Sequence, residues 1–447
     1  MATKLSVAKI AKEDAILKTL VTDLSGGLRE IIFPISFLPE VISTGIAYDG
    51  SSFEGINDIN SSDAIIKGVE ETLVKVDPSI ADTEKEEYWI ICNILDVNGN
   101  PHPNCSRSKL VELQKKLAKT WKGGNLFVGA EPEAFFVTPE KKGEIGKDFG
   151  GNANYFNPKD PKKFIISEIM NVLENMDFEI ERAHSEVGDE QFEINWRFDR
   201  AERTADKIQI YKQVSHKVAQ NYGFDVTFLP KPYPSRNGSG MHMHLSVGDG
   251  KTNFFFDEKA RENRYFSTKA LHFLSGILKE IPSLAAISNR TEVSYSRLVP
   301  GYEAPCVIAM GACNRSAACR IPAIADPKAM KKGIRAEFRF PDPLANPYLL
   351  AAGFIALGIA GLENKTKFKG FTEEDLFSMS VEELLRKRFK LIPRTLWDSY
   401  QNYAKNSILQ KAFGKSMHAS YAGLVLHEID VCQPFANTKS MEMHYFD

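Results

Sequence analysis

Four short stretches of the chain carry polar side chains at every second position, a spacing that places them on one face of a β-strand. Bulky apolar residues alternate with them, so the opposite face of each strand suits a buried core. The polar residues are Glu131 and Glu133; Gln191, Glu193, Asn195 and Arg197; His242, His244 and Ser246; and Arg335, Glu337 and Arg339. A single strand of this kind is equally well explained as a solvated surface strand. Four of them, rich in glutamate and histidine, favour a shared polar cavity.

Crowded carboxylates in such a cavity require a cation, because mutual repulsion and the loss of water both disfavour their charged form. Glu186, in the stretch HSEVGDE, adds another carboxylate to the set. Oxygen ligands with one or two histidines suit Mg²⁺ or Mn²⁺ better than zinc. Arginines are suited to bind a carboxylate or a phosphate through paired hydrogen bonds. Those near these stretches are Arg297, Arg315, Arg320, Arg335 and Arg339.

Metal ions, glutamates and arginines together favour phosphoryl transfer from a nucleotide, a reaction in which charge neutralisation and alignment supply most of the catalysis. The sequence contains neither a GxxxxGK loop followed by Ser or Thr nor a GxGxxG turn that opens a helix. The nucleotide site must therefore belong to another kind of fold. The two glycines of NGSG, residues 237–240, are by themselves a weak signal.

The elements around these stretches predict an α+β protein with a small front domain and a large second domain. The turn-rich stretch VNGNPHPNCS is the candidate boundary and divides the chain into residues 1–104 and 105–447. The apolar segment 348–362 is too short to span a membrane and is interpreted as a buried helix. Strands are expected at 125–137, 191–198, 226–229, 241–247 and 335–340, and helices at 161–176, 204–222 and 267–280.

Composition excludes some classes of function. The 447 residues, 43% of them hydrophobic, suffice for two or more domains. A net charge of −2 gives no overall basic field, so neither a nucleic acid nor a membrane is expected as a partner. The N-terminus shows no secretory pattern and the six cysteines show no paired framework, so reduced thiols and a cytoplasmic location are expected. Cys306, Cys313 and Cys319 are interpreted as small core residues.

Seven stretches, in order, make the chain resemble the type I glutamine synthetases. They are YDGSSFEGI (48–56), GAEPEAFFV (129–137), HSEVGDEQFEI (184–194), KPYPSRNGSGMHMHLS (231–246), RLVPGYEAP (297–305), NRSAACRIP (314–322) and RAEFRFPDPLANPYL (335–349). The resemblance implies an N-terminal β-grasp domain and a catalytic domain in which a half-barrel β funnel is backed by helices. It also implies a dodecamer of two hexameric rings with active sites between subunits.

The activity implied by the resemblance is ATP-dependent ligation of ammonia to L-glutamate, which yields L-glutamine, ADP and phosphate through γ-glutamyl phosphate. Two Mg²⁺ or Mn²⁺ ions are implied in each active site. One would be held by Glu133, Glu186 and Glu193, and the other by Glu131, His242 and Glu337. The glutamate-binding residues would be Asn237, Gly238, Arg297, Glu303 and Arg339. The ATP-binding residues would be Glu181, Phe198, His244, Ser246, Arg315, Arg320, Lys328 and Arg335.

The resemblance gives catalytic roles to Asp49, Glu303 and Arg315. Asp49, supplied by the neighbouring subunit, would bind ammonium and take its proton. Glu303, in the flap PGYEAP, would close the site and assist deprotonation. Arg315 would lie against the phosphoryl transition state.

Two other functions remain open: a ligase that joins glutamate to a polyamine or another amine, and a non-catalytic protein of the same fold. The presence of Asp49 favours ammonia, and the complete set of metal ligands with Glu303 argues against a non-catalytic protein. Residues 373–384 lack a tyrosine at the place of the adenylylation motif, so no control by adenylylation is expected. Cys313, Ile56 and the extra residues 331–333 depart from the family pattern. His184 and His216 are interpreted as structural residues.

Overall fold

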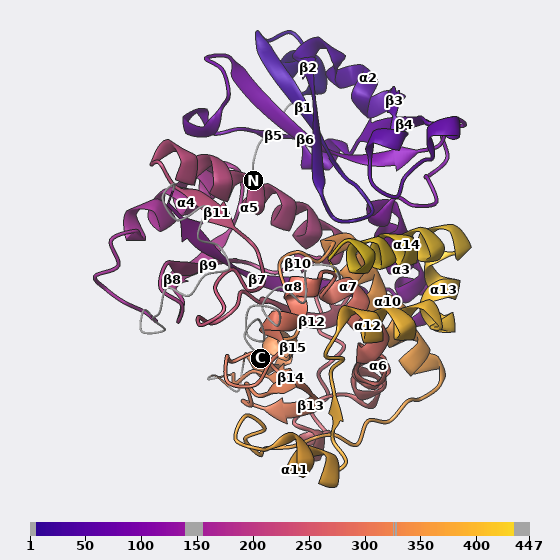
Figure 1. Cartoon of the computed structure of the whole chain (residues 1–447). Coiled ribbons are helices and arrows are strands. Elements are labelled where there is room, and N and C mark those ends of the chain that lie inside the picture. Colours follow the sequence, from indigo (N-terminus) through magenta and orange to yellow (C-terminus); the bar gives the residue numbers. More distant parts are fainter. Residues whose placement is uncertain (1–5, 139–154, 325, 327–328, 433–447) are drawn as a thin grey trace, which may run out of the picture.

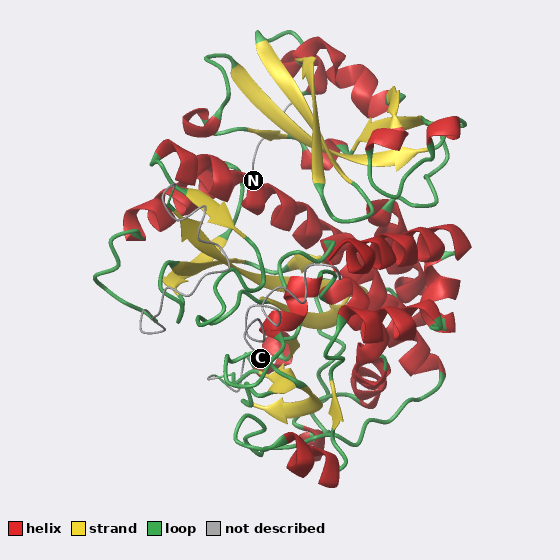
Figure 2. Ribbon diagram, viewed as in Figure 1, coloured by secondary structure: helices red, strands yellow, loops and turns green. Residues whose placement is uncertain are grey.

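The computed structural model describes residues 6–138, 155–324, 326 and 329–432. Two β-sheets with attached helices make up the described chain (Figures 1 and 2). The N-terminal sheet has the strand order β2-β1-β6-β4-β3, with β5 paired to β6. Its strands are β1 Ala15–Thr22, β2 Leu28–Pro34, β3 Ile46–Asp49, β4 Asp63–Gly68, β5 Val74–Lys75 and β6 Glu86–Leu95. Only β1 and β6 pair in parallel; helices α1 Val7–Ile10 and α2 Leu38–Ser43 accompany this sheet.

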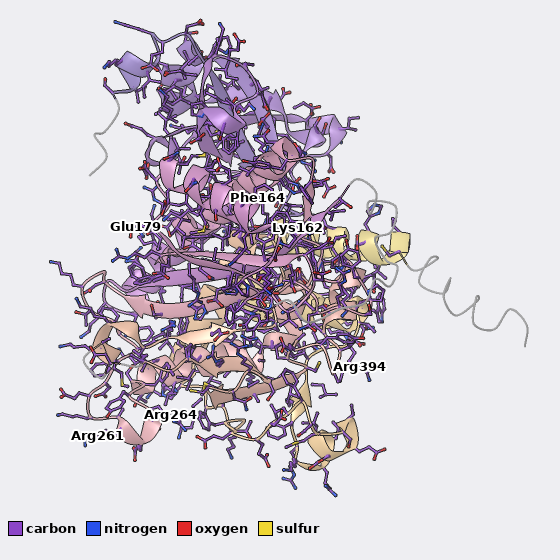
Figure 3. All side chains as sticks on the ribbon, turned by 90° about the vertical axis from the view of Figure 1, so that its left-hand side faces the viewer. Lys162, Phe164, Glu179, Arg261, Arg264 and Arg394 are labelled. Atoms are coloured by element: carbon purple, nitrogen blue, oxygen red, sulfur yellow. The ribbon has the colours of Figure 1, made fainter. Side chains whose placement is uncertain are left out.

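The second sheet follows the order β16-β13-β14-β15-β12-β7-β9-β8, with β10 and β11 also paired to β7. Its strands are β7 Asn125–Val137, β8 Ile180–Ser185, β9 Gln191–Trp196, β10 Asp199–Arg200, β11 Asp225–Thr227, β12 Met241–Gly248, β13 Val307–Ala312, β14 Ala317–Ile321, β15 Ala336–Phe338 and β16 Lys390–Leu391. All pairings except β13 with β14 are antiparallel. Figure 3 shows these strands crossing the middle of the molecule beneath the N-terminal sheet.

Register in the second sheet brings the polar positions of different strands side by side. His242 on β12 lies opposite Glu131 on β7, and Glu133 on β7 lies opposite Glu193 on β9. On the other side of β12, His244 lies opposite Glu337 of β15. Directly opposed side chains in an antiparallel pair are about 5 Å apart at Cβ. The alternation recognised in the sequence therefore becomes one continuous polar face.

Twelve helices belong to the second domain in the described chain. They are α3 Ser106–Thr120, α4 Lys163–Asn175, α5 Ala201–Asn221, α6 Thr268–Lys279, α7 Ile281–Ser288, α8 Glu292–Arg297, α9 Met330–Gly333, α10 Pro347–Glu363, α11 Val381–Arg386, α12 Leu396–Ala404, α13 Ser407–Phe413 and α14 Lys415–Cys432. Of these, α3, α4 and α5 pack directly against strands of the second sheet. Helix α10 is buried almost throughout and packs on α3 and α6. Its N-cap, Asn346, accepts hydrogen bonds from the backbone of Tyr348 and Leu349. The prediction of a buried helix at 348–362 is confirmed.

No single described helix is long and apolar enough to cross a membrane. One bent pair, Thr268–Lys279 with Ile281–Ser288, passes the same test on length and composition alone.

Polar contacts join the N-terminal sheet to the helices of the second domain. The Asn346 amide donates to the carbonyl oxygens of Asp23 at 3.2 Å and Leu24 at 3.1 Å. Gln209 donates to the Thr22 hydroxyl at 2.9 Å. Breaking one of these buried hydrogen bonds leaves a polar group without a partner, which is costly. The hydrogen bonds therefore fix the position of the N-terminal sheet relative to the second domain. Helix α3 begins just after residue 104, but the exact boundary remains a prediction.

Candidate active site

A cavity of about 350 Å³ opens on the polar face of the second sheet. Strands β7, β8, β9, β12 and β15 contribute to its lining, together with the loops around 237 and 303. All six predicted metal ligands line it, and so do all five predicted glutamate-binding residues. Of the predicted ATP-binding residues it holds His244, Arg315, Arg320 and Arg335.

A second cavity, of about 260 Å³, adjoins the first. Glu181, Phe198 and Ser246, which were predicted to bind ATP, line this second cavity together with apolar residues such as Ile334. Lys328 lies outside the described residues. The structure thus divides the predicted ATP set between a strongly charged cavity and a less charged one.

The first acidic cluster consists of His184, Glu186 and Glu193, whose potential ligand atoms all lie within 4.8 Å of one another. The His184 imidazole is 3.3 Å from Glu186 and 3.4 Å from Glu193, nitrogen to oxygen. Burial and the negative charges of Glu133 and Glu193 raise the pKa of Glu186 to about 10. Such a carboxyl ionises only if a positive charge joins it.

The second cluster consists of Glu131, His244 and Glu337, again with ligand atoms within 4.8 Å. His244 Nε2 is 3.2 Å from a carboxylate oxygen of Glu131. His242, which was predicted to share a metal with Glu131 and Glu337, instead lies 3.3 Å from Glu133, at the junction of the two clusters. The difference arises from register, because His244 is the histidine that faces Glu337 across the β12–β15 pair. The role of His242 as a ligand stays a prediction.

Both clusters fit divalent ions. In the described part of the chain, buried nitrogens of His184, His242 and His244 make no aligned hydrogen bond. Buried polar atoms are nearly always paired, so unsatisfied imidazole nitrogens beside carboxylates point to a missing partner. A metal ion accepts the lone pair of a neutral imidazole and neutralises the adjoining carboxylates.

Metal binding is expected to stabilise the folded chain. At a concentration of 100 times the Kd, each ion contributes about 2.7 kcal/mol, which raises Tm by about 3 °C in a protein of this size. Thermal unfolding after chelation, and then with Mg²⁺ or Mn²⁺ restored, measures the shift. Sodium chloride at equal ionic strength is the control, and an identical Tm in all three solutions would contradict the assignment of these clusters.

Two arginines hold the fully buried Glu337. Arg320 donates to one oxygen of this carboxylate at 2.7 Å, and Arg339 donates to the other. Burial alone would raise the pKa of Glu337, but the charges of Arg339, the two histidines and Arg320 outweigh it and hold the pKa at about 2. This carboxylate is therefore ionised at any working pH and keeps two cations at the cavity wall.

Arg297 and Gly238 also line the first cavity. The buried guanidinium of Arg297 donates to the carbonyl oxygens of Phe340 at 2.8 Å and Arg339 at 3.0 Å. A Cβ on Gly238 would lie 2.3 Å from the Pro230 carbonyl oxygen, so only glycine fits here. The glycine therefore lets this loop pack directly against Pro230 and Arg297.

The flap brings a further carboxylate to the cavity. Glu303 has a φ of 60°, a left-handed conformation that is costly for a side chain other than glycine or asparagine. Its carboxylate accepts a hydrogen bond from the Asn237 amide at 3.1 Å. The neighbouring Tyr302 places its ring 3.5 Å from the Lys231 ammonium. These contacts hold Glu303 over the cavity despite the strained backbone.

Sequence interpretation missed several residues that line the first cavity, chiefly His184, Arg182 and Tyr155. His184 was interpreted as structural, but its imidazole lies between Glu186 and Glu193 in the lining of the cavity. Its position two residues before Glu186 was the available signal. Arg182 shares the same alternation on β8. No pattern indicated Tyr155. His216 lies outside the cavity and faces Asp225 at 3.1 Å.

Asp49 does not line the cavity of its own chain. It ends strand β3 in the N-terminal sheet, is exposed, and accepts hydrogen bonds from the hydroxyls of Ser51 at 2.6 Å and Ser52 at 2.9 Å. These bonds lower the pKa of Asp49. Figure 1 shows β3 on the side of the molecule away from β8 and β9. A role for Asp49 in this chemistry therefore requires a second chain.

All six cysteines carry free thiols. Cys319 is buried, as expected of a core residue, and Cys306 is half-buried. Cys313 is exposed, so its interpretation as a core residue is wrong. It follows strand β13 at a φ of 53°, in a turn that carries it out of the sheet.

Two family models match the chain. The model of the glutamine synthetase catalytic domain matches residues 103–444, and that of the glutamine synthetase β-grasp domain matches residues 15–97. This chain belongs to the glutamine synthetase family. Curated relatives agree: the glutamine synthetase of Thermus thermophilus is 34% identical over 94% of this chain and 93% of its own length. That of Rhizobium meliloti is 37% identical over 86% of both chains.

Solved structures confirm the predicted fold of a glutamine synthetase. The Plasmodium falciparum glutamine synthetase superposes with a TM-score of 0.85 over 100% of this chain and 99% of its own, at 22% identity. The complex of GmaS with ADP gives 0.85 over 99% of both chains, at 23% identity. At these identities the likeness shows the fold alone. The N-terminal β-grasp domain and the curled half-barrel sheet backed by helices are thereby confirmed.

Proposed function

We propose that this chain is a glutamate–ammonia ligase, which uses ATP to convert L-glutamate and ammonia into L-glutamine, ADP and phosphate through γ-glutamyl phosphate. Family membership supports a ligase. The observation that carries the proposal is the meeting of two acid–imidazole clusters and several arginines in one cavity. The clusters would hold two Mg²⁺ or Mn²⁺ ions, which offset the repulsion between a carboxylate and a triphosphate when bound.

The cavity has separate places for the two anionic substrates. Asn237, Gly238 and Arg339 would bind glutamate near Glu303, so that its γ-carboxylate points toward the acidic clusters. Arg315 and Arg320 would contact the phosphates, because fixed guanidinium groups stabilise charge that develops on a transferring phosphoryl group. His244, Arg335 and the lining of the second cavity would hold the rest of the nucleotide. The flap would exclude water from the acyl phosphate.

Ammonia is the proposed nucleophile. An ammonium ion would be attracted by carboxylates and lose its proton to one of them before attack. Glu303 is positioned for this in its own chain, whereas Asp49 is exposed on the N-terminal sheet. If Asp49 takes part, it must come from another subunit, so we propose a homo-oligomer with active sites between subunits. The proposed assembly is the dodecamer of two hexameric rings that the family resemblance implies. A cytoplasmic location belongs to the same proposal.

Asp49→Ala is expected to raise the KM for ammonium by about 10- to 100-fold and to leave the KM for ATP unchanged. The reason is that a charge-assisted contact to ammonium contributes about 1.5–3 kcal/mol. Initial rates at varied ammonium concentration measure the effect. Asp58→Ala, which alters another aspartate beyond β3, is the control. An unchanged KM for ammonium in Asp49→Ala would count against the role of this residue.

Phosphate release tests the function directly. The protein is assayed with L-glutamate, ATP and Mg²⁺, and ammonium or one of a panel of alkylamines and polyamines is added separately. The proposal predicts that ammonium gives the highest kcat/KM. A higher value with an amine would favour a γ-glutamyl-amine ligase, and no release with any nucleophile would favour a non-catalytic protein of this family.

A further inference from the structure

Arg182 is held by two contacts that leave much of its guanidinium exposed. The residue lies on β8, and its Nε donates to the Asn195 side chain at 2.9 Å. Its Nη2 donates to a carboxylate oxygen of Glu131 at 2.7 Å. The side chain is 60% exposed, while that of Glu131 is only 15% exposed. Among the described residues no partner is recorded for Nη1, so one edge of this cation is available to a ligand.

The position of Arg182 is between the two cavities. Among the residues that the structure describes, four line both cavities: Glu131, Arg182, His244 and Arg335. A nucleoside in the second cavity, which contains the half-exposed ring of Phe198, must pass its phosphates across this boundary to reach the acidic clusters. Any polyphosphate that joins the cavities therefore passes within reach of this guanidinium.

Glu131 can pair either with Arg182 or with a divalent ion. In the structure it is contacted by Arg182 and by His244 at 3.2 Å, while it also belongs to a cluster suited to a divalent ion. A dication and a guanidinium compete for the same carboxylate oxygens, because each lowers the charge that attracts the other. Arrival of a metal ion weakens the hold of Glu131 on Arg182 and releases the guanidinium for a phosphate.

We propose that Arg182 is an exchangeable cation, which pairs with Glu131 when the adjoining cluster holds no metal and turns to the polyphosphate of a bound nucleotide when a metal replaces it. The inference rests on the proposed function, since it requires a metal–nucleotide substrate. It assigns a phosphate-contacting residue to β8. It also implies that bound metal raises the affinity for nucleotide, and bound nucleotide the affinity for metal, through this one side chain.

Arg182→Gln tests both halves of the proposal by calorimetry, without any measurement of turnover. Mn²⁺ alone is expected to bind the variant about two- to fivefold more tightly, since Glu131 has lost a competitor. In the presence of excess Mg²⁺, ADP is expected to bind about 10- to 100-fold more weakly, whereas adenosine binds as before. Arg182→Lys keeps the charge but not the planar guanidinium. Its affinities for Mn²⁺ and ADP should lie between those of the unmodified protein and those of Arg182→Gln.

Arg261→Gln is the matched control. Arg261 is exposed and lies outside both cavities, and its replacement removes the same charge as Arg182→Gln does. Figure 3 shows Arg261 at the lower end of the molecule, away from Glu179, which stands just before β8. Unchanged affinities for Mn²⁺ and ADP in Arg182→Gln would overturn the inference, as would an equal loss for adenosine. Failure of the unmodified protein to bind ADP with Mg²⁺ would instead overturn the proposed function.

Discussion

Glu303→Ala is expected to lower the rate of glutamine formation from ammonia by about 10²- to 10⁴-fold, the usual contribution of a positioned acid or base. The carboxylate is held over the cavity by the Asn237 amide at 3.1 Å, although the backbone of Glu303 has a costly left-handed conformation. Its removal eliminates the group in this chain that is positioned to take the ammonium proton. Steady-state assays with saturating ATP and glutamate measure kcat, and calorimetry measures ATP binding, which should stay within about twofold.

Glu303→Gln is the companion variant, because glutamine preserves the size of the side chain and a hydrogen bond with Asn237 but carries no charge. An equal loss of kcat in both variants identifies the carboxylate charge as the cause. Normal turnover in Glu303→Ala would refute the flap role, and a loss confined to ATP affinity would show that the flap serves nucleotide binding instead.

Glu186→Gln is expected to lower activity by about 10³-fold or more, since loss of a metal ligand removes several kcal/mol of transition-state stabilisation. The same variant is expected to increase the free energy of unfolding of the metal-free protein. Glu186 is buried beside Glu133 and Glu193, and this environment raises its pKa to about 10. Replacing a disfavoured carboxyl with a neutral amide removes that strain.

The sign of the pH dependence follows from the raised pKa. In the unfolded chain Glu186 loses its proton near pH 4.5, whereas in the folded, metal-free chain it keeps the proton up to about pH 10. Its contribution to stability is therefore progressively lost as the pH rises from about 4.5 toward 10. Urea unfolding in chelator should show this slope in the unmodified protein and a shallower one in Glu186→Gln. Exposed Glu258 serves as the control through Glu258→Gln, and equal slopes in all three proteins would contradict the pKa argument.

Sequence periodicity predicted the elements that carry the site well. Strands β7 and β12 lie where alternation placed them, because each has one continuous apolar face that must be buried. The expected strand at 335–340 is shorter in the structure, where β15 covers only Ala336–Phe338. Arg335 and Arg339 nevertheless flank it on the same side. Alternation therefore predicted which side of the sheet each side chain faces better than it predicted where each strand ends.

The pairing between strands could not be predicted from one sequence. Alternation places His242 and His244 on one face of β12, but only register decides which of them meets Glu337 and which meets Glu133. Arg182 acquires its role from Glu131 on β7, 51 residues away in sequence, and His184 from the pairing of β8 with β9. Asp49 remains apart from the cavity in a single chain. The missing information in each case is a contact between distant segments or between chains.

The central claim is that this cavity binds two divalent ions, and diffraction from crystals containing Mn²⁺ tests it most directly. Anomalous scattering locates manganese independently of any assumption about the ligands. The account predicts two peaks in each active site, one among the carboxylates of Glu133, Glu186 and Glu193 and the other among those of Glu131 and Glu337, where a histidine of β12 completes the site. A single peak, or manganese bound only outside the cavity, would contradict it.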